Sequence, residues 1–117
     1  LVNFYGGAVM PQGNKYHAKY SGSVSYSKKV ILSIISLATM EICGVACLHG
    51  KKVNAEINGD VVDIDVFIDI RIGFSCPDIA FKVQENIKRS VESMTNLKTG
   101  AINVNILSVS FDDGNAL

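Results

Sequence analysis

The stretch from Asp60 to Ile72 alternates apolar and polar side chains more regularly than any other part of the chain. Its even positions from 62 onward are all apolar, namely Val62, Ile64, Val66, Ile68, Ile70 and Ile72. Charges occupy most of the odd positions, at Asp63, Asp65, Asp69 and Arg71. Because successive side chains of a strand point to opposite faces, the pattern predicts a β-strand with one buried face and one polar face.

A second strand is predicted over residues 45–57, with a break near Gly50. The Asn58-Gly59 pair between the two strands is typical of a two-residue type I′ turn, since both residue types tolerate a positive φ. This turn predicts three cross-strand pairs: Ile57 with Asp60, Val53 with Ile64, and Lys52 with Asp65. The pairing keeps the apolar residues of both strands on one face.

The first of two predicted helices covers residues 28–42. Its apolar residues recur at helical spacing, at Val30, Ile31, Ile34, Ile35 and Ala38. Ser25 or Ser27 is suited to cap its start, and Gly44 is a natural stop. The helix is rich in β-branched residues, so burial of one face must stabilise it rather than helix propensity.

The second helix begins at Ser75-Cys76-Pro77-Asp78, where serine caps the free N–H groups and proline needs no hydrogen bond. Its apolar stripe consists of Ile79, Ala80, Val83, Ile87, Val91 and Met94. Two i,i+4 charge pairs are expected on its polar side, Glu85 with Arg89 and Lys88 with Glu92.

Strands are also predicted near both ends of the chain. One covers residues 22–26, and the other covers residues 101–111 with Ile102, Val104 and Ile106 turned inward. The order β-α-β-β-α-β predicts a two-layer α+β domain over residues 22–111, with a mixed or antiparallel sheet and both helices on one face. Residues 1–21 are predicted to be a flexible lead-in and residues 112–117 a tail.

Composition narrows the class of protein. The chain has 117 residues, of which 48% are hydrophobic and 19% charged, as in a globular domain. Eleven basic residues balance eleven acidic ones, so no net field attracts nucleic acid or anionic lipid. The three cysteines cannot all pair within one chain, and neither a signal peptide nor a spanning segment is recognisable, so a reducing cytoplasmic setting without membrane insertion is expected.

Several ordered elements resemble the alkaline shock protein family of Gram-positive bacteria, also called the Gls-type general stress proteins. The elements that match are Glu41-Ile42-Cys43-Gly44-Val45, the strand from Val61 to Ile72, Gly73, Pro77, the "VQENI" helix start from Val83 to Ile87, the turn from Met94 to Leu97, and the strand from Ile102 to Val109. Within the family, the branch found beside acetyl-CoA carboxylase genes is most similar at Gln84-Glu85-Asn86 and Met94-Thr95. The chain departs from the family where a longer insert is cut to His49-Gly50-Lys51-Lys52.

The resemblance implies a non-enzymatic protein of the general or envelope stress response. It also implies a cytoplasmic, self-associating protein that works by protein–protein interaction and is linked to the control of fatty-acid synthesis. The implied partner is a small membrane-anchored protein or an enzyme of fatty-acid synthesis.

Cysteine and histidine chemistry is the competing interpretation. Cys43, Cys47, His49 and Cys76 are potential zinc ligands, but their spacing fits a zinc site loosely, and small buried or half-buried hydrophobes are expected instead. Cys76 at a helix start lacks an obvious base, since His17 and His49 are the chain's two imidazoles. No catalytic residue, metal site or cofactor is therefore predicted.

The polar face of the long strand is the predicted partner-binding site, although a plain solvated face explains the same pattern. Its residues are Lys52, Val61, Asp63, Asp65, Phe67, Asp69 and Arg71. Asp63 and Asp65 lie about 6.5 to 7 Å apart along an extended strand, too far to share a cation easily. Phe67 and Val61 among charges are typical of a contact patch. The alternative functions are a small α+β RNA-binding domain, despite the acidic face and the missing G-x-x-G, and a thiol or zinc enzyme.

Overall fold

The structure is a computed structural model that describes residues 24–111. Its elements are α2 (Lys28–Met40), β2 (Val45–Leu48), the 3-10 turn η1 (Gly50–Lys52), β3 (Asn54–Asn58), β4 (Val61–Arg71), α3 (Cys76–Met94) and β5 (Lys98–Ser110). The predicted lead-in and tail lie outside the described residues.

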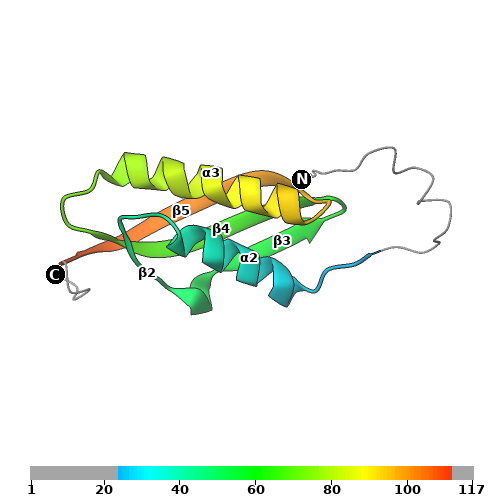
Figure 1. The fold of residues 1–117 in the computed structure, drawn as a ribbon. Coiled ribbons are helices and arrows are strands. Elements are labelled where there is room, and N and C mark those ends of the chain that lie inside the picture. Colours follow the sequence, from blue (N-terminus) through cyan, green and yellow to red (C-terminus); the bar gives the residue numbers. More distant parts are fainter. Residues whose placement is uncertain (1–23, 112–117) are drawn as a thin grey trace.

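The strand β4 is the centre of a four-stranded mixed sheet. β2 and β3 follow each other along one side of β4 and pair with it antiparallel, with η1 between them. β5 pairs with the other side of β4 in parallel, after the crossover through α3. Both helices lie on the same face of this sheet (Figure 1). The structure therefore confirms the two-layer α+β fold.

The core lies between the helices and the apolar face of β4. Its fully buried members are contributed mainly by α2, α3 and β4, and include Ile31, Ile35, Val62, Ile64, Val66, Ile68, Ile70, Ile79, Val83, Ile87 and Val91. Inward residues of β5, among them Ile102, Val104 and Ile106, pack against this cluster. The prediction fails at Ile72, which is 47% exposed because the strand ends at Arg71 and Gly73, at φ 96°, turns the chain away. Met94, at the last position of α3, is exposed too.

The hairpin is shifted by two residues from the predicted register. Asn58 pairs with Val61, so Gly59 and Asp60 form the loop, and Gly59 adopts the positive φ of 64°. The observed pairs include Ile57 with Val62, Ala55 with Ile64, and Asn54 with Asp65. The predicted pairs of Ile57 with Asp60, Val53 with Ile64, and Lys52 with Asp65 are therefore wrong. A shift of two residues leaves every side chain on its predicted face, so the face pattern alone does not exclude either register.

The helix ends largely follow the predicted capping chemistry. Ser27 caps α2 by accepting from the Val30 N–H at 3.3 Å, and Ser75 caps α3 in the same way. α2 ends at Met40 rather than Ile42, because Ile42 lies in the turn that leads to Gly44 at φ 113°.

Of the two charge pairs predicted on α3, the structure confirms one. Lys88 and Glu92 form the predicted ion pair at 3.2 Å. Arg89 donates instead to Asn86, at 3.3 Å, and the predicted pair of Glu85 with Arg89 is not among the ion pairs of residues 24–111.

The predicted first strand is wrong for the part that the structure describes. Residues 24–27 form no strand, and Val24 is 75% exposed. They lead into the start of α2 on the helical side of the sheet, where no neighbouring strand is available (Figure 1). Positions 22 and 23 lie outside the described residues. Neither helix of residues 24–111 is long and apolar enough to cross a membrane.

Candidate functional site

The outer face of the sheet, turned away from both helices, carries all seven predicted site residues. On β4, Asp63, Asp65, Phe67 and Arg71 are half-buried, whereas Asp69 is only 7% exposed. Val61 at the start of the strand and Lys52 in η1 are exposed. The predicted residues therefore share one face, although they divide into separate groups.

The first group is a pair of carboxylates that β5 holds in place. Asp63 Oδ1 accepts from the main-chain N–H of Ala101 at 2.9 Å. Asp65 Oδ1 accepts from the side-chain amide of Asn103 at 2.8 Å. These bonds explain the aspartates without a bound cation. Sequence reasoning missed them because it did not identify β5 as the parallel neighbour of β4.

The second group is Lys52 with Phe67. The Lys52 ammonium lies 5.8 Å from the centre of the Phe67 ring, within the range of a cation–π interaction. Lys52 was expected opposite Asp65, but Asn54 occupies that place. The centre of the outer face is thus an aromatic ring with a cation above it.

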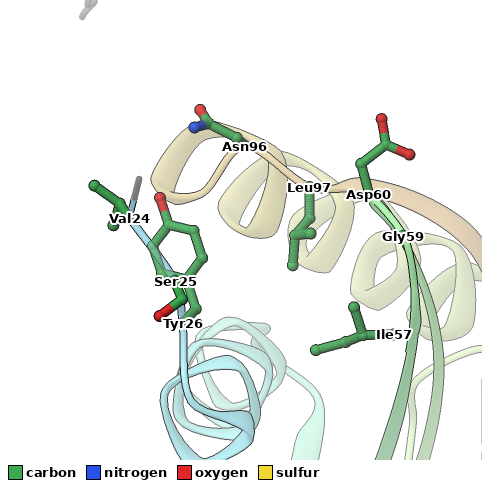
Figure 2. A pocket seen from close by; sticks show the side chains of 8 residues that line it. All are labelled: Val24, Ser25, Tyr26, Ile57, Gly59, Asp60, Asn96 and Leu97. Carbon is green, nitrogen blue, oxygen red and sulfur yellow. The ribbon is translucent and has the colours of Figure 1, made fainter. Parts of the chain in front are cut away.

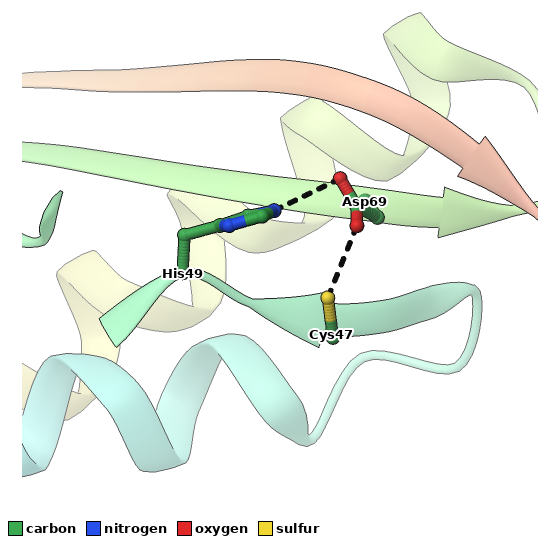
Figure 3. A group of neighbouring side chains, drawn as sticks. All are labelled: Cys47, His49 and Asp69. Atoms are coloured by element: carbon green, nitrogen blue, oxygen red, sulfur yellow. Dashed lines mark hydrogen bonds and ion pairs between the residues drawn. The ribbon is translucent and has the colours of Figure 1, made fainter. Parts of the chain in front are cut away.

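The third group joins Asp69 to two side chains of the neighbouring edge segment. Cys47 Sγ donates to Asp69 Oδ2 at 3.1 Å, and His49 Nε2 lies 3.0 Å from Asp69 Oδ1 (Figure 3). Cys47 is exposed and the His49 side chain is 36% exposed. The cluster therefore has a buried carboxylate at its base and two accessible side chains, a thiol and an imidazole, beside it.

A β-bulge in β2 builds this cluster. Val45 pairs with Ile70, but Cys47 pairs with Asp69, because the register shifts by one residue between Val45 and Cys47. Without that shift Cys47 would stand opposite Ile68 and point into the core. The His49 main chain is fixed in turn by its N–H, which donates to the Phe67 carbonyl at 2.8 Å.

The hydrogen bonds of the cluster favour the ionised form of Asp69. Burial alone would raise the pKa of this carboxyl, but hydrogen bonds from His49, Cys47 and Ser108 outweigh burial and lower the pKa below its ordinary value. Burial, followed by the bond to Asp69 and its negative charge, raises the pKa of the Cys47 thiol. The thiol donates to a carboxylate rather than to an imidazole base, so the arrangement does not favour the nucleophilic thiolate that a cysteine enzyme needs.

The remaining cysteines lie apart from the cluster. Cys43 is in the turn after α2, and Cys76 is the first residue of α3. All three cysteines are free and exposed, so the expectation that they are small buried or half-buried hydrophobes is wrong. Of the four potential zinc ligands considered from sequence, the structure brings together Cys47 and His49 alone and adds Asp69. His17 lies outside the described residues.

A separate pocket of about 270 Å³ opens where the approach to α2 meets the β3–β4 turn and the α3–β5 connection (Figure 2). It is lined by Val24, Ser25, Tyr26, Ile57, Gly59, Asp60, Asn96 and Leu97. This lining offers the carboxylate of Asp60 but neither an imidazole nor a thiol. The outer face of the sheet, rather than this pocket, therefore concentrates the chemistry of residues 24–111.

Solved structures share the fold. A variant of MamM-CTD has a TM-score of 0.58 and 14% identity, over 69% of this chain and 98% of that one. The cadmium form of another MamM CTD variant also has a TM-score of 0.58, with 13% identity, over 69% and 96% of the two chains. The fold and the outer face of the sheet thus define a small two-layer α+β domain in which one polar face of the sheet is not covered by helices.

Sequence comparison then gives the family. The profile of the alkaline shock protein 23 family, described as having a cell envelope-related function, matches residues 48–111, more than half of the chain. YqhY of Bacillus subtilis (strain 168) is 33% identical over 107 residues, spanning 78% of this chain and 79% of YqhY. Spy1535 of Streptococcus pyogenes serotype M6 is 24% identical over 102 residues, spanning 75% and 79% of the two chains. The chain belongs to this family, which confirms the predicted resemblance.

Proposed function

We propose that the protein is a non-enzymatic adaptor or regulator of cell-envelope homeostasis and stress response, and that it acts in the cytoplasm by binding another protein. Membership of a cell envelope-related family supports the broad role. The outer face of the sheet supports binding as the mechanism, because its reactive groups are already engaged with one another.

The observation that carries the proposal is the position of Phe67. Its half-buried ring lies at the middle of a sheet face that neither helix covers, with the Lys52 ammonium 5.8 Å from its centre. Interface cores combine aromatic side chains with a polar rim, and here Asp65 and Asp69 flank the ring along β4. A partner that covers Phe67 would desolvate the Lys52–Phe67 pair and strengthen it.

The carboxylates on the face indicate the character of the partner. Asp63 and Asp65 each accept one hydrogen bond from β5 and keep further acceptor capacity. Partner groups with N–H donors, such as arginine side chains, fit them best. The proposed partner on this face is a small membrane-anchored protein or an enzyme of fatty-acid synthesis that presents arginine side chains.

Self-association is proposed through the other exposed feature of the sheet. Among residues 24–111, β5 pairs with a strand on one side alone, and it is 13 residues long. An edge strand of this length is a template for pairing with a second copy. The two contacts use different parts of the sheet and do not exclude each other.

The test compares capture of native cytoplasmic proteins by the wild type, Phe67→Asp and Val30→Asp. Val30 is 45% exposed on α2, so its variant adds the same charge in place of an apolar side chain on the opposite layer. Loss of the partner with Phe67→Asp and retention with Val30→Asp are expected. Lys52→Glu, at an exposed position, repeats the test if Phe67→Asp does not fold.

A folded Phe67→Asp variant that captures every wild-type partner would refute the choice of face. Salt-dependent retention of RNA by the purified protein would support the RNA-binding alternative instead.

A further inference from the structure

Three side chains of different ligand chemistry meet at one point on the outer face. The Cys47 sulfur, a ring nitrogen of His49 and a carboxylate oxygen of Asp69 all lie within 4.8 Å of one another. They come from the edge segment and the central strand, and Figure 3 shows both His49 and Cys47 directed at Asp69. Thiolate, imidazole and carboxylate together are typical ligands of a zinc-class ion.

We propose that Cys47, His49 and Asp69 bind a divalent transition-metal ion of the Zn²⁺ class, with a fourth position left open to water or to an external ligand. The proposal is independent of the partner-binding role argued above. It also differs from the set considered from sequence, because neither Cys43 nor Cys76 takes part.

The spacing suits such an ion after a small adjustment. In a tetrahedral zinc site, bonds of about 2.0 to 2.3 Å place ligand atoms about 3.3 to 3.8 Å apart. Here Cys47 Sγ lies 3.1 Å from Asp69 Oδ2, and His49 Nε2 lies 3.0 Å from Oδ1, the other oxygen of the same carboxylate. All three ligand atoms lie within 4.8 Å of one another. Side-chain rotation therefore has to lengthen the two contacts with the carboxylate by a few tenths of an ångström and to bring the sulfur and the ring nitrogen to the same spacing.

The charge balance also fits. Binding breaks the Cys47 S–H bond and releases that proton to solvent, because the metal ligand is the thiolate. Thiolate and carboxylate together then neutralise the two charges of the ion, while the imidazole binds in its neutral form. The hydrogen bonds now made within the cluster are replaced by bonds to the metal.

The surroundings hold the ligands in advance. Asp69 stands on the central strand of the sheet and accepts a hydrogen bond from Ser108 of β5. Cys47 is held opposite it by the bulged β2–β4 pairing. Outer partners such as the Ser108 hydroxyl orient a ligand and typically affect affinity by about 10–100-fold.

The ligand types define which ions compete. One sulfur and one imidazole nitrogen select Zn²⁺, Co²⁺ or Ni²⁺ over Mg²⁺ or Ca²⁺, which prefer oxygen. The open fourth position makes a site that exchanges its ion, in contrast to a closed four-ligand structural site.

The experiment titrates the reduced, chelator-stripped full chain with Co²⁺ and then displaces it with Zn²⁺. One equivalent of Co²⁺ should give thiolate-to-metal charge transfer in the near ultraviolet and visible bands of four-coordinate cobalt, both removed by Zn²⁺. Isothermal titration gives the affinity for Zn²⁺. Mg²⁺ should produce no signal.

Variants locate the site. Cys47→Ser and His49→Ala, both at accessible positions, should weaken Zn²⁺ binding by at least ~100-fold, since losing a ligand costs no less than losing an outer partner. The Cys43→Ser/Cys76→Ser double variant, which keeps Cys47, should bind as the wild type does. Circular dichroism checks the fold of each.

The proposal fails if the wild type binds no Zn²⁺ at one equivalent, or if binding survives the loss of Cys47 and His49 together. It also fails if removal of Cys43 and Cys76 abolishes binding. Each of these results leaves the capture test with Phe67→Asp unaffected.

Discussion

The side-chain amide of Asn86 in α3 donates to the main-chain carbonyl of Ala38 in α2 at 2.7 Å. Ala38 lies in the last turn of α2, where carbonyl groups lack a partner within the helix. The same amide donates to the Glu41 carboxylate at 2.8 Å. Two positions earlier, Gln84 donates to the Ile102 carbonyl of β5 at 2.9 Å. The polar residues of the "VQENI" motif therefore join α3 to both of its neighbours.

Replacing Asn86 with alanine should destabilise the fold by about 1–3 kcal/mol, because the Ala38 carbonyl would lose its donor in a partly buried place. Urea denaturation of the variant and the wild type measures the difference. Glu85→Ala, at the exposed neighbouring position, should change stability by less than about 0.5 kcal/mol. Equal effects of the two substitutions would contradict a structural role for the amide.

Gly44→Ala should lower the free energy of unfolding by about 1–3 kcal/mol or more, because Gly44 has a φ of 113°, which residues with a side chain rarely adopt. A methyl group there would also lie 2.6 Å from Ile79 Cδ1 and 2.9 Å from Phe74 Cδ1. Thermal unfolding provides the measurement. Gly50→Ala is the matched control, since a methyl group at Gly50 meets no atom within 4 Å. A Gly44→Ala variant as stable as this control would show that the turn adapts freely.

Glu92 should make folding stability fall in acid. Burial alone would raise the pKa of this carboxyl, but hydrogen bonds from the Thr99 N–H and hydroxyl, and from Lys88, hold its pKa below the ordinary value. A carboxyl with a lowered folded pKa contributes stability above its unfolded pKa of about 4.3, and that contribution is lost as the pH falls through the folded pKa.

Glu92→Gln should therefore be less stable than the wild type by about 1–2 kcal/mol near neutral pH. The gap should narrow as the pH falls below about 4, where the wild-type carboxylate becomes protonated. Denaturation curves across this pH range measure the gap, with Glu85→Gln as the exposed control. A gap that stays constant with pH would show that the Glu92 charge does not contribute.

Sequence reasoning succeeded where one residue type dictates local geometry. The alternation through β4 predicted the buried face, and Ser27 and Ser75 predicted the helix starts. It failed where the outcome depends on how strands align. The hairpin register was wrong by two residues because Gly59-Asp60 and Asn58-Gly59 are both acceptable loops that preserve the faces.

The cluster of Cys47, His49 and Asp69 was missed for the same reason. The sequence pattern groups Asp69 with Asp63 and Asp65, since all three lie on one face of β4. The bulge that brings Cys47 opposite Asp69 has no sequence signal in the residues around Ala46. A Cys-x-His pair near a break in an edge strand is the one hint that the sequence holds.

The parallel pairing of β4 with β5 has a consequence for how the protein folds. The two strands are separated in the chain by the whole of α3, so their contact closes a long loop, and such distant pairings slow folding. During synthesis β5 is the last described element to leave the ribosome. Until it does, one side of β4 remains without its neighbour, and the nascent chain carries an open, aggregation-prone edge.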